Sequence, residues 1–295
     1  MLFSNKGRKK NKAEFVFRLS LKYKGKMKIW ASFFILLCCL SLSAQENVLN
    51  ANGKYLTLGV GIPIHTVRDQ AHSTLAYRGG GFRIFTNFEE IKDNGVFRLA
   101  LSFDNASLKA KVKPRRDIGG AAELNDISFS VGYYARVGDE LNKDNRQYVG
   151  GAFNVQANNR SYPLPTNNTQ SLLFQSSFSV GALDRRSIDG SDIWMATTRI
   201  ELPVITALYQ PTYIGVPPFL HIPEVKAKDF FGNFKLVSFN KFFKITVGVD
   251  ADNQVRDWRS DRLAYDWSLL YTPLPKTKPM IATVGSLGYG FRVLL

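Results

Sequence analysis

The chain has 295 residues, with 39 Lys and Arg against 24 Asp and Glu, and two cysteines. The basic excess does not indicate nucleic-acid binding, because ten basic residues and only one acid lie in the first 44 residues. The positive charge of a nucleic-acid-binding protein belongs to its folded domain. Both cysteines, Cys38 and Cys39, lie in the same N-terminal segment, which excludes disulfide bonds and thiol catalysis for residues 45–295.

Residues 27–44 have the pattern of a secretory signal peptide. Met27 and Lys28 precede an apolar run from Ile29 to Leu42, and the small residues Ser43 and Ala44 follow. A basic start, an apolar run of about 7–15 residues and a small-residue exit are typical of such peptides. We therefore expect 1–44 to be a basic N-terminal extension plus a cleaved signal peptide. Residues 1–26 are interpreted as the product of an upstream start codon rather than a long basic region.

Residues 45–295 contain ten stretches in which apolar and polar residues alternate. Side chains of a β-strand point to opposite faces in turn, so this pattern predicts strands. In the fourth stretch, Ile127, Phe129 and Val131 fall on one face, and Ser128 and Ser130 on the other. The predicted strands are 55–63, 79–90, 95–110, 125–138, 146–160, 170–183, 192–209, 234–250, 260–272 and 281–295.

The connections between these strands alternate in length. Longer segments, four of the five containing proline, follow the odd-numbered strands. Short ones follow the even-numbered strands, including the tight-turn sequence Asp93-Asn94-Gly95. Only 251–259, after the eighth strand, is longer than this scheme prefers. Pro203 predicts a bulge or a strand end in the seventh strand, because proline cannot donate to the ladder. Splitting that strand there and the eighth at Asn240-Lys241 would give twelve strands, but ten are favoured.

This pattern predicts an all-β protein, a single antiparallel transmembrane β-barrel of about ten strands. An even strand number with alternately short and long connections is typical of bacterial outer-membrane barrels with periplasmic termini. Nine of the ten predicted strands have twelve or more residues, above the usual five or six of soluble sheets. Alternation alone also fits a soluble β-sandwich, which stays open as an alternative.

The last strand has an apolar residue at every second position and resembles the C-terminal insertion signal of outer-membrane proteins, although it ends in leucine rather than an aromatic residue. These positions are Leu287, Tyr289, Phe291, Val293 and Leu295. At the level of architecture, 45–295 resembles the outer-membrane β-barrel proteins of Gram-negative bacteria, and no short motif ties it to one member. The resemblance implies outer-membrane lipid and the barrel assembly machinery as partners, and no nucleic acid.

Polar residues in mid-strand are expected to face the barrel lumen. A basic residue facing the bilayer midplane would cost about 2–4 kcal/mol. The predicted lumen residues are Arg98, Arg136, Asn154, Gln156, Arg160, Arg199, Glu201, Lys244 and Asp266. Either these side chains pair and plug a narrow barrel, or their excess of positive charge lines a small anion-favouring pore. Plugging is favoured, because side chains fill barrels of about eight strands.

No cofactor or metal site is predicted, since 45–295 has no cysteine and its three histidines are scattered. His65, His72 and His221 all fall in predicted loops, and the adjacency of His72 and Ser73 does not establish a catalytic geometry. The close acidic pairs are interpreted as turn residues: Asp189 with Asp192, and Asp250 with Asp252.

The sequence therefore favours a non-enzymatic outer-membrane barrel, either a narrow small-solute or anion channel or a surface-loop binding protein. Two alternatives stay open. One is a barrel enzyme that hydrolyses lipid or peptide, with His72 or His221 at the rim. The other is a secreted, soluble β-sandwich with a binding role.

Overall fold

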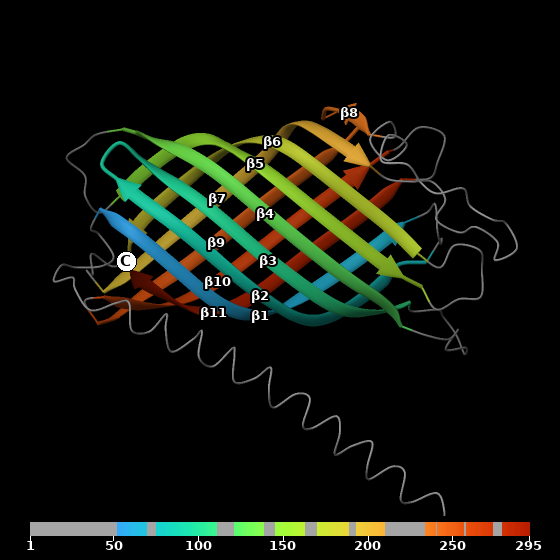
Figure 1. The fold of residues 1–295 in the computed structure, drawn as a ribbon, viewed down its shortest axis with the longest axis horizontal. Helices are drawn as coiled ribbons and strands as arrows, with labels where there is room; N and C mark the ends of the chain where they lie inside the picture. The colour runs from blue at the N-terminus through green and yellow to red at the C-terminus, as the bar shows by residue number, and fades with distance from the viewer. Residues whose placement is uncertain are drawn as a thin grey trace, which may run out of the picture. The chain divides into compact units, whose positions relative to one another are not determined.

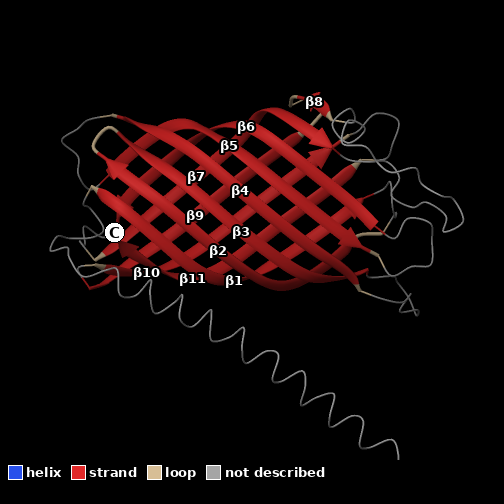
Figure 2. Ribbon diagram, viewed as in Figure 1, coloured by secondary structure: helices blue, strands red, loops and turns tan. Residues whose placement is uncertain are grey.

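The computed structural model describes residues 52–69, 75–110, 121–138, 145–162, 170–188, 193–209, 234–239, 241–256, 258–273 and 279–295. All regular elements in these ranges are β-strands (Figure 2). Among the described residues, no helix is long and apolar enough to span a membrane. The predicted extension and signal peptide, 1–44, lie outside the described residues.

Ten long strands of the described chain close into one antiparallel barrel, as predicted (Figure 1). Each long strand pairs with the next one along the chain, and β1 pairs with β11 to close the sheet. The long strands are β1 (Gly53–Asp69), β2 (Tyr77–Lys92), β3 (Gly95–Ala110), β4 (Ala122–Val137), β5 (Asn145–Ser161), β6 (Gln170–Ser187), β7 (Trp194–Tyr209), β9 (Phe243–Arg256), β10 (Arg259–Thr272) and β11 (Met280–Leu294). A short strand, β8 (Lys235–Val237), pairs with the end of β7.

The turn between β9 and β10 is shorter than predicted. The segment 251–259 was expected to be a connection, but β9 continues to Arg256 and β10 begins at Arg259. Arg259 and Asp261, which break the alternation, lie partly exposed at the barrel end and form an ion pair of 3.0 Å. Charged residues are tolerated there because the strand end lies beyond the apolar band. The assignment of Asp250 and Asp252 to a turn was therefore wrong.

Pro203 lies at a bulge in β7, as predicted. Phe178 of β6 pairs with Ile205, whereas Ser179 pairs with Pro203, so that Val204 is the extra residue. On the opposite side of β7, pairing with β9 ends at Glu201. Pairing resumes with β8 at Thr206.

The predicted eighth strand, 234–250, is interrupted. The amide groups of Lys241 and Phe242 both donate to the carbonyl of Ser238 at 2.9 Å, which forms a turn. The turn changes the alternation: Val237 is buried inside and Leu236 is 76% exposed, the reverse of the prediction. Phe239 is 48% exposed, as predicted, and the regular alternation of the predicted strand resumes with β9 at Phe243.

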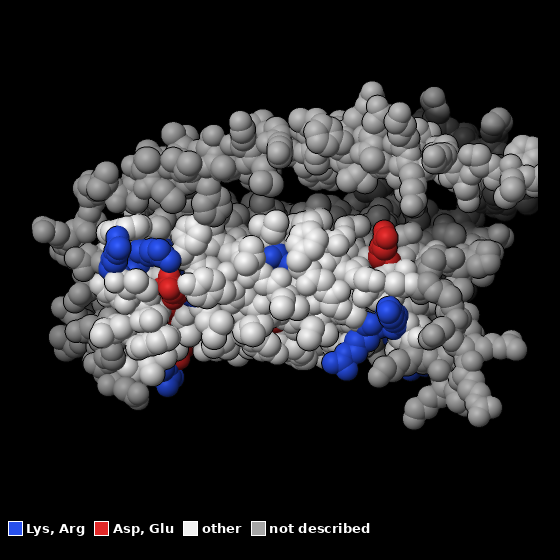
Figure 3. All heavy atoms as spheres, turned by 90° about the horizontal axis from the view of Figure 1, so that it is seen from below, with Lys and Arg blue, Asp and Glu red and all other residues white. Residues whose placement is uncertain are grey.

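The outer face of the barrel is apolar. Six side chains from β1, β2 and β11 are 49–65% exposed: Val60, Ile62, Phe82, Ile84, Leu287 and Tyr289. Figure 3 shows a broad, nearly uncharged band across one side of the barrel, with Lys, Arg, Asp and Glu gathered toward its ends. A β-sandwich would bury its apolar faces between two sheets. The closed barrel with an apolar exterior excludes that alternative.

Candidate functional site

Side chains that point inward fill the barrel in three layers along its axis. Contacts between strands that are not neighbours in the sheet identify these side chains, because such contacts cross the interior. The first layer lies at the end with the short turns. The second lies in the middle, and the third lies at the end with the long connections.

The first layer, here called the charged layer, is built around Arg262 of β10. Its guanidinium donates to the two carboxylate oxygens of Asp252 at 2.7 and 2.9 Å and to Glu89 of β2 at 3.2 Å. Arg292 lies 3.2 Å from Glu89 and 3.4 Å from Asp252, and its guanidinium carbon is 3.9 Å from the ring centre of Tyr55. The side chains of Arg262, Arg292 and Asp252 are at most 1% exposed. The layer therefore fills the interior beside β2, β9, β10 and β11.

Buried apolar and aromatic side chains complete this end of the barrel. They are Tyr55, Ile91, Val96, Tyr134, Tyr148 and Leu183. Arg98 extends from the charged layer toward the barrel middle and lies 3.7 Å from Glu89 and 4.0 Å from Asp250. Buried charges persist only when they are paired and hydrogen-bonded, and Arg262, Arg292 and Arg98 each meet at least one carboxylate.

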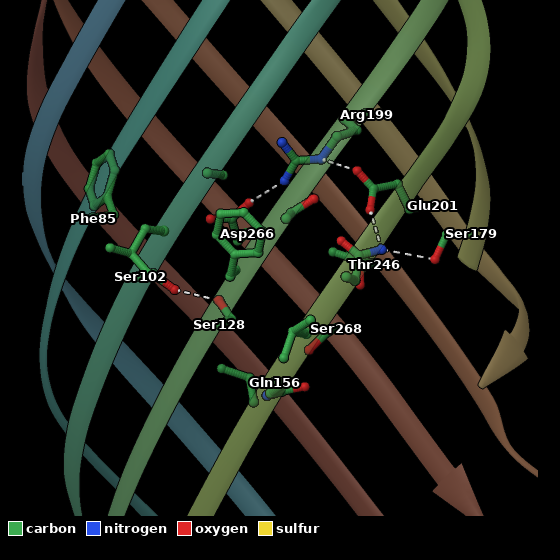
Figure 4. Close-up of a pocket in the computed structure, with 18 of the residues that line it drawn as sticks. Phe85, Ser102, Ser128, Gln156, Ser179, Arg199, Glu201, Thr246, Asp266 and Ser268 are labelled. Atoms are coloured by element: carbon green, nitrogen blue, oxygen red, sulfur yellow. Dashed lines mark hydrogen bonds and ion pairs between the residues drawn. The ribbon is translucent and has the colours of Figure 1, made fainter. Parts of the chain in front are cut away.

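The middle layer encloses a cavity of about 160 Å³ (Figure 4). Arg199 bridges Glu201 and Asp266 at 3.2 Å each. The charged side chains around the cavity comprise four bases and five acids: Arg83, Arg98, Arg199 and Lys244, with Asp104, Asp126, Glu201, Asp250 and Asp266. The acids balance the bases, so the lining lacks the excess of positive charge that would favour anions.

Gln156 of β5 connects the two sides of this cavity. Its amide nitrogen donates to Asp126 at 2.6 Å, and its oxygen accepts from Lys244 at 2.8 Å and Gln175 at 2.8 Å. Oδ1 of Asp126 and Oε1 of Gln175 face no donor among the described residues. A polar cavity of this size can hold several ordered water molecules. The middle layer is thus a polar compartment with room for water.

His65 is part of this interior and not of a loop, contrary to the prediction, because β1 continues to Asp69. Its Nε2 lies 3.3 Å from Asp104, whose carboxylate also accepts from Arg83 at 2.6 and 2.9 Å. The side chains of His65 and Asp104 are 1% and 3% exposed. A lipid or peptide cannot reach a pair so deeply enclosed. The other two histidines, His72 and His221, lie outside the described residues.

The third layer is largely apolar. Two clusters close the end with the long connections: Val67, Tyr77, Ala106, Leu108, Ala122, Leu124 and Tyr162, and Leu173, Leu208, Val237, Phe242, Leu270 and Met280. Arg160 is fully buried among them, and its guanidinium lies 3.4 Å from Asp69. Side chains therefore fill the lumen at both ends, above and below the polar cavity.

The structure brings seven of the nine predicted lumen residues around one cavity: Arg98, Asn154, Gln156, Arg199, Glu201, Lys244 and Asp266. Arg160 lies apart in the third layer beside Asp69. Arg136 lies near the end of β4, away from the cavity lining. The five residues of the predicted insertion signal alternate along the outer face of β11 and at its end: Leu287, Tyr289, Phe291, Val293 and Leu295. Their role in membrane insertion stays a prediction.

The sequence interpretation missed Glu89, Arg262 and Arg292 of the charged layer and Arg83 beside the cavity. Glu89 and Arg83 have the same strand parity, opposite to the apolar residues Phe82 and Ile84, and that parity was a usable signal. Arg292 likewise alternates with apolar neighbours in the last strand. In both strands the apolar face carries the clearer pattern, and the charged residues lie on the opposite face.

No protein-family model and no curated protein matches the sequence. Among solved structures, the outer membrane protease OmpT from Escherichia coli is similar with a TM-score of 0.52 and 8% identity, covering 82% of this chain and 97% of that chain. Neisserial surface protein A gives 0.33 and 14%, covering 82% and 97%, and OprG from Pseudomonas aeruginosa gives 0.35 and 6%, covering 83% and 96%. Such identities show the fold alone. The chain shares the architecture of Gram-negative outer-membrane β-barrels, as its resemblance implied.

Proposed function

We propose that this protein is an outer-membrane β-barrel with a closed lumen, which holds its long connections at the cell surface for binding. The observation that carries this proposal is the charged layer. Arg262, Arg292 and Asp252 are almost completely buried on the adjacent strands β9, β10 and β11, and both arginines also reach Glu89 of the non-neighbouring strand β2. A constitutive channel needs a continuous aqueous path, and this layer interrupts it.

The membrane orientation is supported by the connections. At one end of the barrel the strands are joined by 7, 11, 8, 25 and 7 residues, and at the other end by 2, 7, 6 and 2. In bacterial outer-membrane barrels the short turns are periplasmic and the long loops extracellular. The apolar outer band matches the hydrocarbon of the bilayer, and the predicted signal peptide provides for export.

A narrow anion channel is the weaker candidate. The cavity would have to open through both the charged layer and the apolar third layer. Its lining holds four bases against five acids, so it offers no electrostatic preference for anions. The polar cavity is better explained as the hydrated centre of a barrel that side chains fill.

Two measurements test this proposal. Purified protein in planar bilayers should give no stable conductance, and a reproducible anion-selective conductance would favour the channel instead. An epitope inserted within 210–233 should be accessible to antibody on intact cells. Labelling only after permeabilisation would overturn the orientation. In both cases, fractionation with heated and unheated gel lanes establishes that a folded barrel has reached the outer membrane.

A further inference from the structure

Three basic side chains lie together on the outer face, at the end with the long connections. Arg78 of β2 pairs in register with Thr66 of β1 and with Lys109 of β3. Arg68 lies two residues beyond Thr66 on the same face of β1. Paired residues of antiparallel strands have Cα atoms about 4.5–5.5 Å apart. Arg68, Arg78 and Lys109, here called the basic patch, therefore converge on one area.

Among the residues that the structure describes, the basic patch has no acidic partner, unlike the outer face at the opposite end. There, Arg259 pairs with Asp261 and Lys92 pairs with Glu90, both at 3.0 Å. All three side chains of the patch are exposed, and none forms an ion pair with a described acid.

Among the described residues, Glu123 of β4 is an exposed acid on the next strand along this rim. It stands opposite Ser107, two residues from Lys109, and it does not pair with the patch among the described residues. Three unpaired cations on adjacent strands leave a local positive charge available to an anion.

A glycine beside exposed apolar side chains adjoins the basic patch on the side of the barrel middle. Gly80, with Ile64 and Phe82 beside it, is here called the notch. Gly80 lies between Ile64 of β1 and Ser107 of β3. A Cβ atom added at Gly80 would make one tight contact, 3.2 Å to the carbonyl oxygen of Pro63, and would meet no side chain within 4 Å. Ile64 and Phe82 are 48% and 49% exposed beside it. The notch can receive an alkyl chain directly next to the cations.

The patch stands where lipid headgroups lie. Arg78 is four residues from Phe82, about 13 Å along a strand that rises about 3.3 Å per residue. Phe82 belongs to the exposed apolar band, and the connection to β1 begins just beyond Arg78. The patch therefore sits at the border between the hydrocarbon and the polar headgroups.

We propose that the basic patch binds the phosphate groups of a phosphorylated glycolipid of the outer leaflet, with one acyl chain in the notch beside Gly80. Arginine forks bind phosphate oxygens in pairs, and lysine adds a point charge. Clusters of basic residues beside a membrane attract anionic lipids. The choice of a glycolipid rests on the proposed orientation, in which the long connections face the cell exterior.

The test uses the purified full barrel in detergent and measures binding of lipid A. The variant Arg68→Gln/Arg78→Gln/Lys109→Gln should bind lipid A at least about tenfold more weakly. Lys92→Gln, an exposed and paired lysine at the other end, is the matched control and should bind like the unmodified protein. The heat-dependent gel shift of each variant shows that it is folded.

Three further ligands test which chemical groups of lipid A the basic patch binds: dephosphorylated lipid A, inorganic phosphate and phosphatidylglycerol. Dephosphorylated lipid A should lose binding to the same extent as the triple variant. Equal binding of the triple variant and the unmodified protein would overturn the proposal. So would full competition by inorganic phosphate at equal concentration, or equal affinity for phosphatidylglycerol. Because binding is measured in detergent, its failure leaves the conductance and surface-labelling results untouched, and the two proposals fail separately.

Gly80→Leu gives an independent test of the notch. The leucine side chain would occupy the space beside Ile64 and Phe82 while leaving all three cations in place. Binding of lipid A should weaken, whereas binding of a phosphorylated disaccharide without acyl chains should stay unchanged. Unaltered lipid A binding by Gly80→Leu would exclude the notch as the acyl-chain site.

Discussion

Arg262→Ala is the substitution that tests the closed interior most directly. Arg262 is bonded to Asp252 and Glu89 and lies 3.4 Å from Asp250, with a side chain only 1% exposed. Alanine would leave these three carboxylates to Arg292 and Arg98. Removing one partner of a buried ion pair costs about 3–5 kcal/mol, because the other charge stays buried. We expect a loss of about 4 kcal/mol in the free energy of unfolding.

The assay is reversible urea unfolding of the barrel in lipid vesicles, followed by fluorescence of its three tryptophans, Trp194, Trp258 and Trp267. Arg262→Lys keeps the charge but loses the planar fork, so it should fall between Ala and the unmodified protein. The double variant Arg262→Met/Asp252→Leu removes both members of the shortest ion pair in the charged layer. It should be less destabilised than Arg262→Ala, because an apolar replacement of both partners leaves fewer buried charges unpaired.

A loss below about 1 kcal/mol for Arg262→Ala would refute this reasoning, since that is the range of a solvated surface ion pair. Water would then have to reach the charged layer in the native barrel. Such a result would also remove the main support for a closed lumen, and the same protein should then conduct ions in a planar bilayer.

Three further predictions address the wall and its insertion. Gly59→Ala should destabilise the barrel by about 1–3 kcal/mol in the same assay, because the new Cβ would lie 2.2 Å from the ring of Phe85. Gly285→Ala, whose nearest neighbour would be 3.8 Å away, should change stability by less than about 0.5 kcal/mol, and equal effects would contradict the packing argument. Val60→Arg, in the exposed apolar band, should cost about 2–4 kcal/mol in vesicles, and a neutral effect would argue against lipid contact there. Tyr289→Asp should lower recovery of heat-modifiable protein in the outer membrane, and normal assembly would count against the insertion signal.

The faces of most strands were predictable from alternation alone. Ile127 and Tyr133 are exposed on the outer side of β4, and Asp126 and Tyr134 are buried inside, as the parity indicates. The barrel topology followed from the lengths of the connections, since short turns after even-numbered strands leave only neighbouring antiparallel pairs. Both inferences use local sequence, which is why they were within reach.

The interruption between β8 and β9 shows where local sequence misleads. Apolar residues at Val237, Phe239 and Phe243 keep a period of two, yet the turn at Ser238 places Val237 inside. Pro203 and the bulge at Val204 lie on the facing strand, where pairing with β9 has stopped. The bulge in β7 and the turn between β8 and β9 therefore occur at neighbouring places in the sheet. The sequence pattern of one strand alone does not show that its neighbour is also interrupted there.

The partners across the lumen were out of reach for a related reason. Arg262 and Glu89 are 173 residues apart in the chain, and their contact depends on how far the strands are staggered when the sheet closes. Parity places both side chains inside but does not set their height along the barrel axis. Whether the inward side chains leave a pore or form a plug depends on these heights.

The charge of the lumen was also mispredicted. The nine predicted lumen residues comprise five bases and two acids and suggested an excess of positive charge, whereas Asp104, Asp126 and Asp250 balance the charge of the cavity lining. Whether a narrow barrel conducts is thus decided by contacts between distant strands, and the amphipathic pattern shared by pores and plugs carries no information about them.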